Sequence, residues 1–266
     1  MNNMKAQIVL FASAVLMVCS CQKENLAEVS TAKNSVVATI AEEDTKTTVD
    51  GTNVTWKEDD QIDIAYENDK VIKNVTYKLD NTYAGQKQGV FTGDEISSTE
   101  DCYAVYPAVA ASYTSGVKFV FTTPTSQKAA ENVGKYMQMY STPFKMGEKV
   151  EFQHLNCALK VTINPSSETT ISRIEVRNSS GGDWPSKTYT ITNGAVVGTA
   201  KSSQTVTLDI NEKISGSKDY YIALAPKAKD IKWSITVYYD GTSSYKQATT
   251  TKLLEAGKLY TGSFNL

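Results

Sequence analysis

Short stretches of alternating apolar and polar residues, separated by turn residues, make up most of this chain after residue 34. Alternation with a period of two places successive side chains on opposite faces of an extended strand. Residues 61–66 (QIDIAY) alternate strictly, and residues 158–163 (ALKVTI) repeat the pattern. Asp50 and Gly51 form a strong hairpin-turn signal, because alternating residues flank them on both sides. The chain is therefore predicted to consist mainly of short β-strands.

The predicted strands follow one another at short, regular intervals. They cover residues 36–40, 61–66, 75–79, 89–91, 102–106, 117–121, 136–140, 150–155, 158–163, 171–176, 188–191, 205–210, 220–225, 231–239 and 258–266, with a hairpin over 45–56. Residues 126–135 contain Gly134 and few apolar anchors, so at most a short helical turn is expected there. Strands in such a series predict an antiparallel sandwich rather than a βαβ fold.

A weak internal repeat predicts two domains. Residues 101–107 (DCYAVYP) resemble residues 219–226 (DYYIALAP), since each is an apolar strand with an acidic start and a proline at its end. The separation fits two similar β-sandwiches, and Pro143 and Gly147 mark a break between them. We therefore expect domains at residues 35–146 and 147–266.

The amino-terminal segment has the features of a lipoprotein signal peptide over residues 1–20. Residues 8–18 are almost wholly apolar, a run shorter than the about 20 residues that span a bilayer. Residues 18–21 (VCSC) resemble the bacterial lipobox, which predicts that Cys21 is lipidated and becomes the mature amino terminus. Cys19 fits less well, because Val18 would then precede the modified cysteine directly. The alternative is a signal peptide with incidental cysteines. Residues 21–34 are polar and aperiodic, as expected of a tether.

The net charge indicates which partners to expect, and the cysteines indicate whether a disulfide is expected. The formal net charge is −2, so no basic surface is expected to recruit nucleic acid. Only Arg173 and Arg177 among the 27 basic residues are arginines. Cys102 and Cys157 could form a disulfide outside the cytoplasm, but two single cysteines in apolar strands are more typical of buried thiols.

No arrangement of residues predicts a reaction mechanism. His154 is the one histidine and lies beside apolar strand residues, which favours a structural role over that of a catalytic base. One histidine and two cysteines after the leader do not favour a tetrahedral zinc site, and EF-hand and phosphate-binding loops are absent from the sequence. Acidic clusters at 42–44, 58–60, 94–95 and 100–101 lie at strand ends, where solvated carboxylates are common. We expect no metal and no cofactor.

Tryptophan offers the clearest candidate for ligand binding. Trp56 and Trp233 lie in alternating strands and are expected in the core. Trp184 lies in the loop 179–185 (SSGGDWP), where an aromatic side chain could contact a glycan or a host protein. Trp184 is therefore the candidate ligand contact.

Several strings, taken in order, resemble fimbrillin-like lipoproteins of Bacteroidales, the major and minor subunits of type V pili. The lipobox is followed by residues 46–51 (KTTVDG), 54–56 (VTW) and 60–62 (DQI). Further on come residues 103–107 (YAVYP), 152–159 (FQHLNCAL) and 255–260 (EAGKLY). The resemblance spans nearly the whole mature chain, and its order and spacing are more specific than any single string.

The resemblance implies two tandem transthyretin-like antiparallel β-sandwich domains and a lipid anchor in the outer membrane. It also implies that a protease removes the first strand, so that a strand of another fimbrial subunit can replace it. Family members matured by an arginine-specific protease carry a basic residue there; this chain has no arginine before Arg173, which leaves Lys46 as the candidate cleavage site. Residues 259–266 are the candidate donor strand.

These observations favour a non-enzymatic fimbrial subunit or accessory adhesin, lipid-anchored and exposed on the cell surface until it joins a fimbrium. A surface lipoprotein that binds glycans without polymerising is the alternative. A hydrolase is the least favoured class, because the single histidine and the dispersed carboxylates suggest no mechanism.

Overall fold

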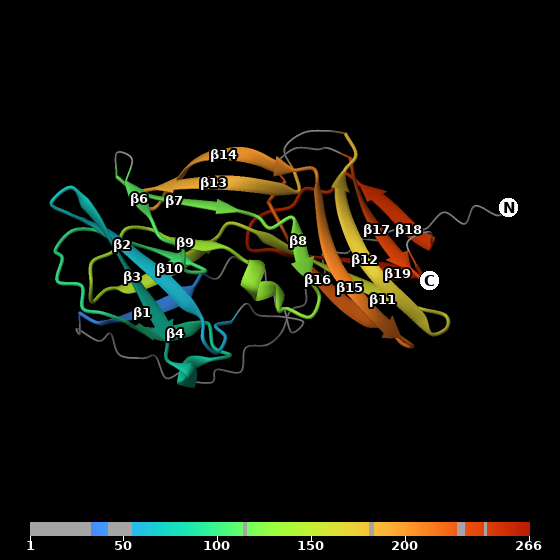
Figure 1. Cartoon of the computed structure of the whole chain (residues 1–266), viewed down its shortest axis with the longest axis horizontal. Coiled ribbons are helices and arrows are strands. Elements are labelled where there is room, and N and C mark those ends of the chain that lie inside the picture. The colour runs from blue at the N-terminus through green and yellow to red at the C-terminus, as the bar shows by residue number, and fades with distance from the viewer. Residues whose placement is uncertain (1–32, 42–54, 114–115, 181–183, 228–231, 242–243) are drawn as a thin grey trace, which may run out of the picture.

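The computed structural model describes residues 33–41, 55–113, 116–180, 184–227, 232–241 and 244–266. These residues form nineteen β-strands in four sheets and two short 3-10 helices, η1 (Asn81–Tyr83) and η2 (Val133–Tyr136). In Figure 1 a barrel lies at the left, a sandwich lies at the right, and a smaller sheet runs along the top between them.

Seven strands close into the barrel. They are β1 (Ser35–Ile40), β2 (Gln61–Asn68), β3 (Val71–Leu79), β4 (Gln88–Thr92), β5 (Cys102–Tyr106), β9 (Met139–Ser141) and β10 (Lys149–His154). Their order around the barrel is β1-β10-β9-β5-β2-β3-β4. The barrel closes because β1 pairs antiparallel with β4 on one side and parallel with β10 on the other.

Trp56 lies at the centre of the barrel core, shortly before β2. Its ring meets those of Phe91, Tyr106 and Phe152 edge to face, at centroid distances of 4.9, 5.5 and 5.6 Å. Such pairs contribute about 0.5–1.5 kcal/mol each beyond their buried area. The expectation that Trp56 is a core residue is confirmed, since its side chain is fully buried.

Two sheets form the sandwich. One contains β18 (Ser244–Thr250), β17 (Trp233–Tyr239), β12 (Thr169–Asn178), β15 (Thr205–Ile214) and β8 (Ser126–Lys128), in this order. The other contains β16 (Lys218–Leu224), β11 (Cys157–Asn164) and β19 (Leu259–Asn265). The pairs β8–β15 and β11–β19 are parallel and the others are antiparallel.

The fourth sheet contains β14 (Ala195–Ser203), β13 (Ser186–Thr192), β7 (Val117–Thr122) and β6 (Ser112–Tyr113). Asn193 and Gly194 connect β13 to β14 with φ angles of 48° and 73°. Such turns favour glycine, because a side chain at Gly194 would be strained and its Cβ would approach Cδ of Pro143 to 2.8 Å. Phe119 and Phe121 on β7 belong to the same buried cluster as the sandwich core.

The all-β, sandwich-type fold that the alternation predicted is confirmed. Two features were not predicted: seven strands close into a barrel, and three strand pairs are parallel. The sequence pattern missed β6, β8, β14 and β18. Residues 195–200 of β14 are all exposed, so no apolar face marks that strand. The hairpin predicted over 45–56 lies largely outside the described residues, and its last two residues are not in a strand.

The sheets do not separate at the predicted boundary between residues 146 and 147. β10 follows that boundary but pairs with β1 and β9 in the barrel. Conversely, β7 and β8 precede it but pair with β13 and β15 of the second half. Residues 126–135, where at most a short helical turn was expected, contain most of η2, which is such a turn, and also the unpredicted strand β8.

Candidate functional site: the seat of the first strand

The first strand is an interior part of the barrel. Val36, Ala38 and Ile40 point into the barrel core and are 3%, 0% and 3% exposed. A valine or isoleucine side chain contributes roughly 1.5–3 kcal/mol when it is fully buried, and Ala38 contributes less. The strand β1 is therefore part of the hydrophobic core and not a loose amino-terminal extension.

Backbone hydrogen bonds hold both ends of β1. Just before the strand, the carbonyl of Asn34 accepts from the amide of Gly93 at 3.1 Å. Just after it, the amide of Ala41 donates to the carbonyl of Phe152 at 2.9 Å. If β1 left the barrel, the amides and carbonyls of β4 and β10 that face it would lose their partners. Buried groups of this kind require replacement partners, so the vacated position would favour another strand.

The predicted lipidation and cleavage sites flank β1 in the sequence. Cys21 precedes β1 and Lys46 follows it, and both lie outside the described residues. A cut after Lys46 would detach the segment that contains β1 together with the predicted lipid. Lipidation of Cys21 and cleavage after Lys46 therefore remain predictions from the sequence.

The carboxyl-terminal strand β19 lies at an edge of the sandwich, paired with β11 alone among the described strands. Tyr260, Gly262 and Phe264 point inward, while residues between them are more exposed. In both strands a smaller core-facing side chain lies between two larger ones: Ala38 between Val36 and Ile40 in β1, and Gly262 between Tyr260 and Phe264 in β19. Like β1, this strand is parallel to its neighbour in the middle of the chain.

Trp184 is a core residue, which corrects its assignment as a ligand contact. Its side chain is 1% exposed, and its indole Nε1 donates to the carbonyl of Ala225 at 2.6 Å. The ring packs edge to face against Trp233 at a centroid distance of 5.2 Å. The loop composition around Trp184 is polar, but the ring points into the sandwich and has no free face for a sugar.

His154 lies at the end of β10 and is 8% exposed. The residues that the structure describes contain no hydrogen-bond partner for its Nδ1 atom. Burial penalises the charged imidazolium and lowers the pKa of His154 from 6.5 to about 4. The position is that of a packed core residue, and its neutral form is the one the fold accommodates.

The protein is expected to lose stability as the pH falls from about 6.5 to about 4, because the unfolded chain binds a proton at His154 and the folded chain does not. The shift corresponds to at most about 3 kcal/mol. Urea unfolding at pH 7.5 and pH 4.5 measures this loss, and H154Q should lose up to about 2.5 kcal/mol less than the wild type between the two pH values, because pH 4.5 lies about two units below the unfolded pKa. An identical pH dependence in H154Q would contradict this role.

Cys102 and Cys157 are buried free thiols on β5 and β11. Burial raises the pKa of the Cys102 thiol to about 12 and also raises the pKa of Cys157. Thiols that stay protonated are poor nucleophiles and poor metal ligands. The preference for buried thiols over a disulfide between these residues is confirmed.

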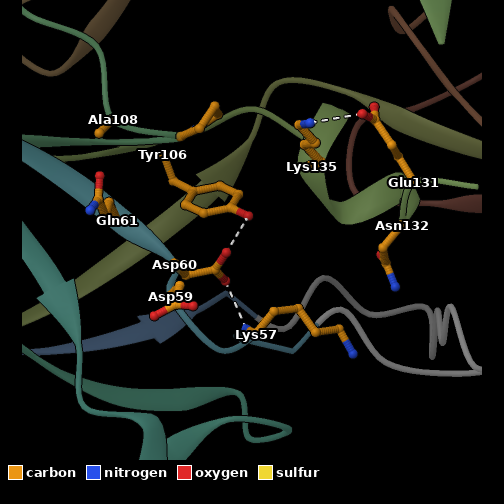
Figure 2. Close-up of a pocket in the computed structure, with 10 residues that line it drawn as sticks. Lys57, Asp59, Asp60, Gln61, Tyr106, Ala108, Glu131, Asn132 and Lys135 are labelled. Atoms are coloured by element: carbon orange, nitrogen blue, oxygen red, sulfur yellow. Dashed lines mark hydrogen bonds and ion pairs between the residues drawn. The ribbon is translucent and has the colours of Figure 1, made fainter. Parts of the chain in front are cut away.

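A hollow of about 450 Å³ lies between the barrel and the segment that leads into η2 (Figure 2). Asp60 is held there by two donors: the Tyr106 hydroxyl at 2.9 Å and the Lys57 amide at 2.7 Å. Burial raises the pKa of Asp60 and that of Tyr106. On the other side, Glu131 accepts from Lys135 at 2.9 Å.

The carboxylates of this hollow already have donors within the protein. The Asp60 contacts brace the loop before β2 against β5, and the Glu131 contact braces the turn before η2. The part of the chain that the structure describes has no group of three or more metal-binding side chains. It also has no helix long and apolar enough to cross a membrane.

The fold defines the class of this protein: an all-β chain in which a first strand completes a barrel and a sandwich follows. A family model described as fimbrillin-like matches residues 45–266. This match covers most of the chain, and the protein belongs to the fimbrillin-like family. Among curated proteins, none matches the sequence significantly.

Solved structures share the fold. A candidate cell adhesion protein from Bacteroides uniformis is 17% identical, with a TM-score of 0.52 over 87% of this chain and 92% of that chain. Another from Bacteroides ovatus is 14% identical, with a TM-score of 0.54 over 88% of this chain and 92% of that chain. At these identities the similarity concerns the fold alone.

Proposed function

We propose that this protein is a cell-surface lipoprotein that serves as a structural subunit or accessory adhesin of a pilus and joins its neighbours by strand exchange. Its membership of the fimbrillin-like family supports the fimbrial role. The observation that carries the proposal is the position of β1, a core strand of the barrel that lies between the predicted anchor and the predicted cleavage site.

The exchange would proceed in two steps. Cleavage after Lys46 separates β1 from the rest of the chain and releases the subunit from its lipid. The space between β4 and β10 then accepts a strand from another subunit, with backbone hydrogen bonds supplying affinity and alternate side chains setting register. The family match begins at residue 45, so the part of the chain shared with the family follows β1.

The donor in this proposal is the carboxyl-terminal strand of another copy, residues 259–266. The core-facing residues Tyr260, Gly262 and Phe264 match the large–small–large order that β1 presents to the barrel. As an edge strand with one described partner strand, β19 also has fewer ladder contacts to break than an interior strand. A heterologous fimbrial subunit could supply the strand in the same way.

Limited trypsin digestion of the mature protein, followed by denaturing gels without heating, tests the assembly. A ladder of oligomers is expected in the wild type. K46A and a chain truncated before Leu259 should each remain monomeric, the first because β1 is retained and the second because no donor is present. Clipped wild-type protein that stays monomeric would reject strand exchange and leave a non-polymerising surface lipoprotein.

Lipidation has its own test. C21A is expected to abolish incorporation of radiolabelled fatty acid, whereas C19A should retain it. One acyl chain gives only marginal membrane binding, so stable anchoring depends on the multiple chains of a lipoprotein cysteine. Unchanged labelling of C21A would move the modification to another residue.

A further inference from the structure

The outer face of the five-stranded sheet carries aromatic and charged side chains that neither the core nor strand exchange uses. On β12, Ile174 and Val176 point into the sandwich core. The alternate residues Arg173, Glu175 and Arg177 therefore lie on the opposite face. β12, β17 and β18 lie side by side at the right of Figure 1.

Strand register places three planar groups in one row across this face. Tyr245 on β18 pairs with Tyr238 on β17, and Tyr238 pairs with Arg173 on β12. The two tyrosine rings have centroids 6.0 Å apart and are tilted by 41°. The Arg173 guanidinium carbon lies 3.8 Å from the centroid of the Tyr238 ring, within cation–π distance.

Glu175 holds this row in place. Its Oε1 atom accepts from Nε of Arg173 at 2.7 Å, and its Oε2 atom accepts from the Tyr238 hydroxyl at 3.1 Å. The ion pair balances the charge of Arg173 and fixes the Tyr238 ring. The Tyr245 ring at the end of the row is 60% exposed, so one preorganised ring lies beside one that a ligand can cover.

Arg177 adds an unmatched cation to the same face. It is exposed, and its guanidinium makes no hydrogen bond or ion pair with the described residues. Both arginines of the chain therefore lie on one face of one strand. A guanidinium binds a carboxylate through two parallel hydrogen bonds, which a lysine ammonium cannot do.

Polar groups fill the space between Tyr245 and Arg177. Gln247 on β18 is exposed and donates through Nε2 to Oγ1 of Thr236 at 3.0 Å, which leaves its amide oxygen able to accept from a hydroxyl group. Two strand spacings separate Tyr245 from Arg173, about 10 Å, and four residues separate Arg173 from Arg177, about 13 Å. The diagonal of about 16 Å is longer than a single sugar ring.

We infer that this face, formed by Tyr245, Tyr238, Arg173, Gln247 and Arg177, binds an extended polysaccharide that contains uronic acid. A sugar ring stacks on Tyr245, hydroxyl groups bond to Gln247, and one carboxylate pairs with Arg177. The charge balance argues against polyanions that carry several charges on each sugar. Glu175 pairs with Arg173, and the exposed Asp209, which accepts from Ser126 at 3.2 Å, lies on the same face opposite Lys128 of β8. Among these residues Arg177 is the one cation without an opposite charge, so the face suits few negative charges.

Calorimetric titration of the full mature chain with polygalacturonate and with alginate oligomers tests this site. R177Q and Y245A should each raise Kd by about tenfold or more, because they remove the charge-assisted pair and the stacking ring respectively. Y245F should stay within about twofold, since it keeps the ring. K73Q removes one exposed positive charge from β3 of the barrel and should leave Kd unchanged.

Methyl-esterified polygalacturonate provides the matched ligand control, because it lacks only the charge of the carboxylates. It should bind the wild type as weakly as the free acid binds R177Q. Equal affinity for ester and acid, no binding of either uronate by the wild type, or stronger binding of dextran sulfate, a polyanion without uronic acid, than of polygalacturonate would overturn the proposal. R177Q should keep the wild-type thermal midpoint and the wild-type ladder of oligomers after trypsin. The glycan-binding proposal and the strand-exchange proposal are therefore tested independently.

Discussion

An A38D substitution is expected to free β1 from the barrel. Ala38 lies at the middle of the strand, is 0% exposed and faces the aromatic core of the barrel. A carboxylate there would be buried without a cation. This lowers the stability of the folded state by several kcal/mol unless β1 leaves the barrel or the carboxylate takes up a proton. We expect the variant to expose the edges of β4 and β10 without any cleavage.

Hydrogen exchange at neutral pH measures this release. Amides of β4 and β10 should exchange at least about tenfold faster in A38D, while amides of β12 and β17 in the sandwich keep their protection. A41D is the matched control: it makes the same change at a half-buried position just after β1. Equal protection of β4 and β10 in A38D and A41D would show that β1 is not held by its core-facing side chains.

A W184A substitution is expected to destabilise the sandwich by about 3–5 kcal/mol. The indole fills space against Trp233 and donates to the carbonyl of Ala225, so truncation leaves a cavity and a buried acceptor with only the weak thiol donor of Cys157, at 3.8 Å. Urea unfolding at pH 7.5 gives the loss directly. W184F, which keeps one ring, should have an intermediate stability.

W184F also distinguishes a core role of Trp184 from a role in ligand binding. W184F should fold and should bind uronate oligomers with the wild-type Kd, because the ring lies inside the sandwich and not on the outer face of the sheet. Wild-type stability combined with lost glycan binding in W184F would return Trp184 to the ligand site.

Local sequence pattern succeeded where a strand has one buried face. β10 and most of β11 alternate between a core side and a more open side, and both were predicted within one residue at each end. β14 failed the same test because an edge strand exposed on both faces has no alternation to detect. Trp184 failed for a related reason: its polar loop carries no information about which way the indole ring turns.

The composition and alternation of the sequence alone determined that this is an all-β protein, because strand periodicity is a local property of the chain. The order of its short motifs likewise indicated the fimbrillin-like family, and the family match confirms that membership. The lipid anchor at Cys21 and the cut after Lys46 are also predicted from sequence, and the labelling and trypsin experiments test them.

Only the tertiary structure decided which strands meet. The parallel pairing of β1 with β10 joins residues more than a hundred positions apart, and no local pattern specifies that register. The row from Tyr245 to Arg173 has the same origin, because three strands must align before an arginine lies over a tyrosine. Long-range register depends on the packing of the whole core. For that reason the position of the first strand between β4 and β10 and the proposed glycan-binding face appear only in the folded protein.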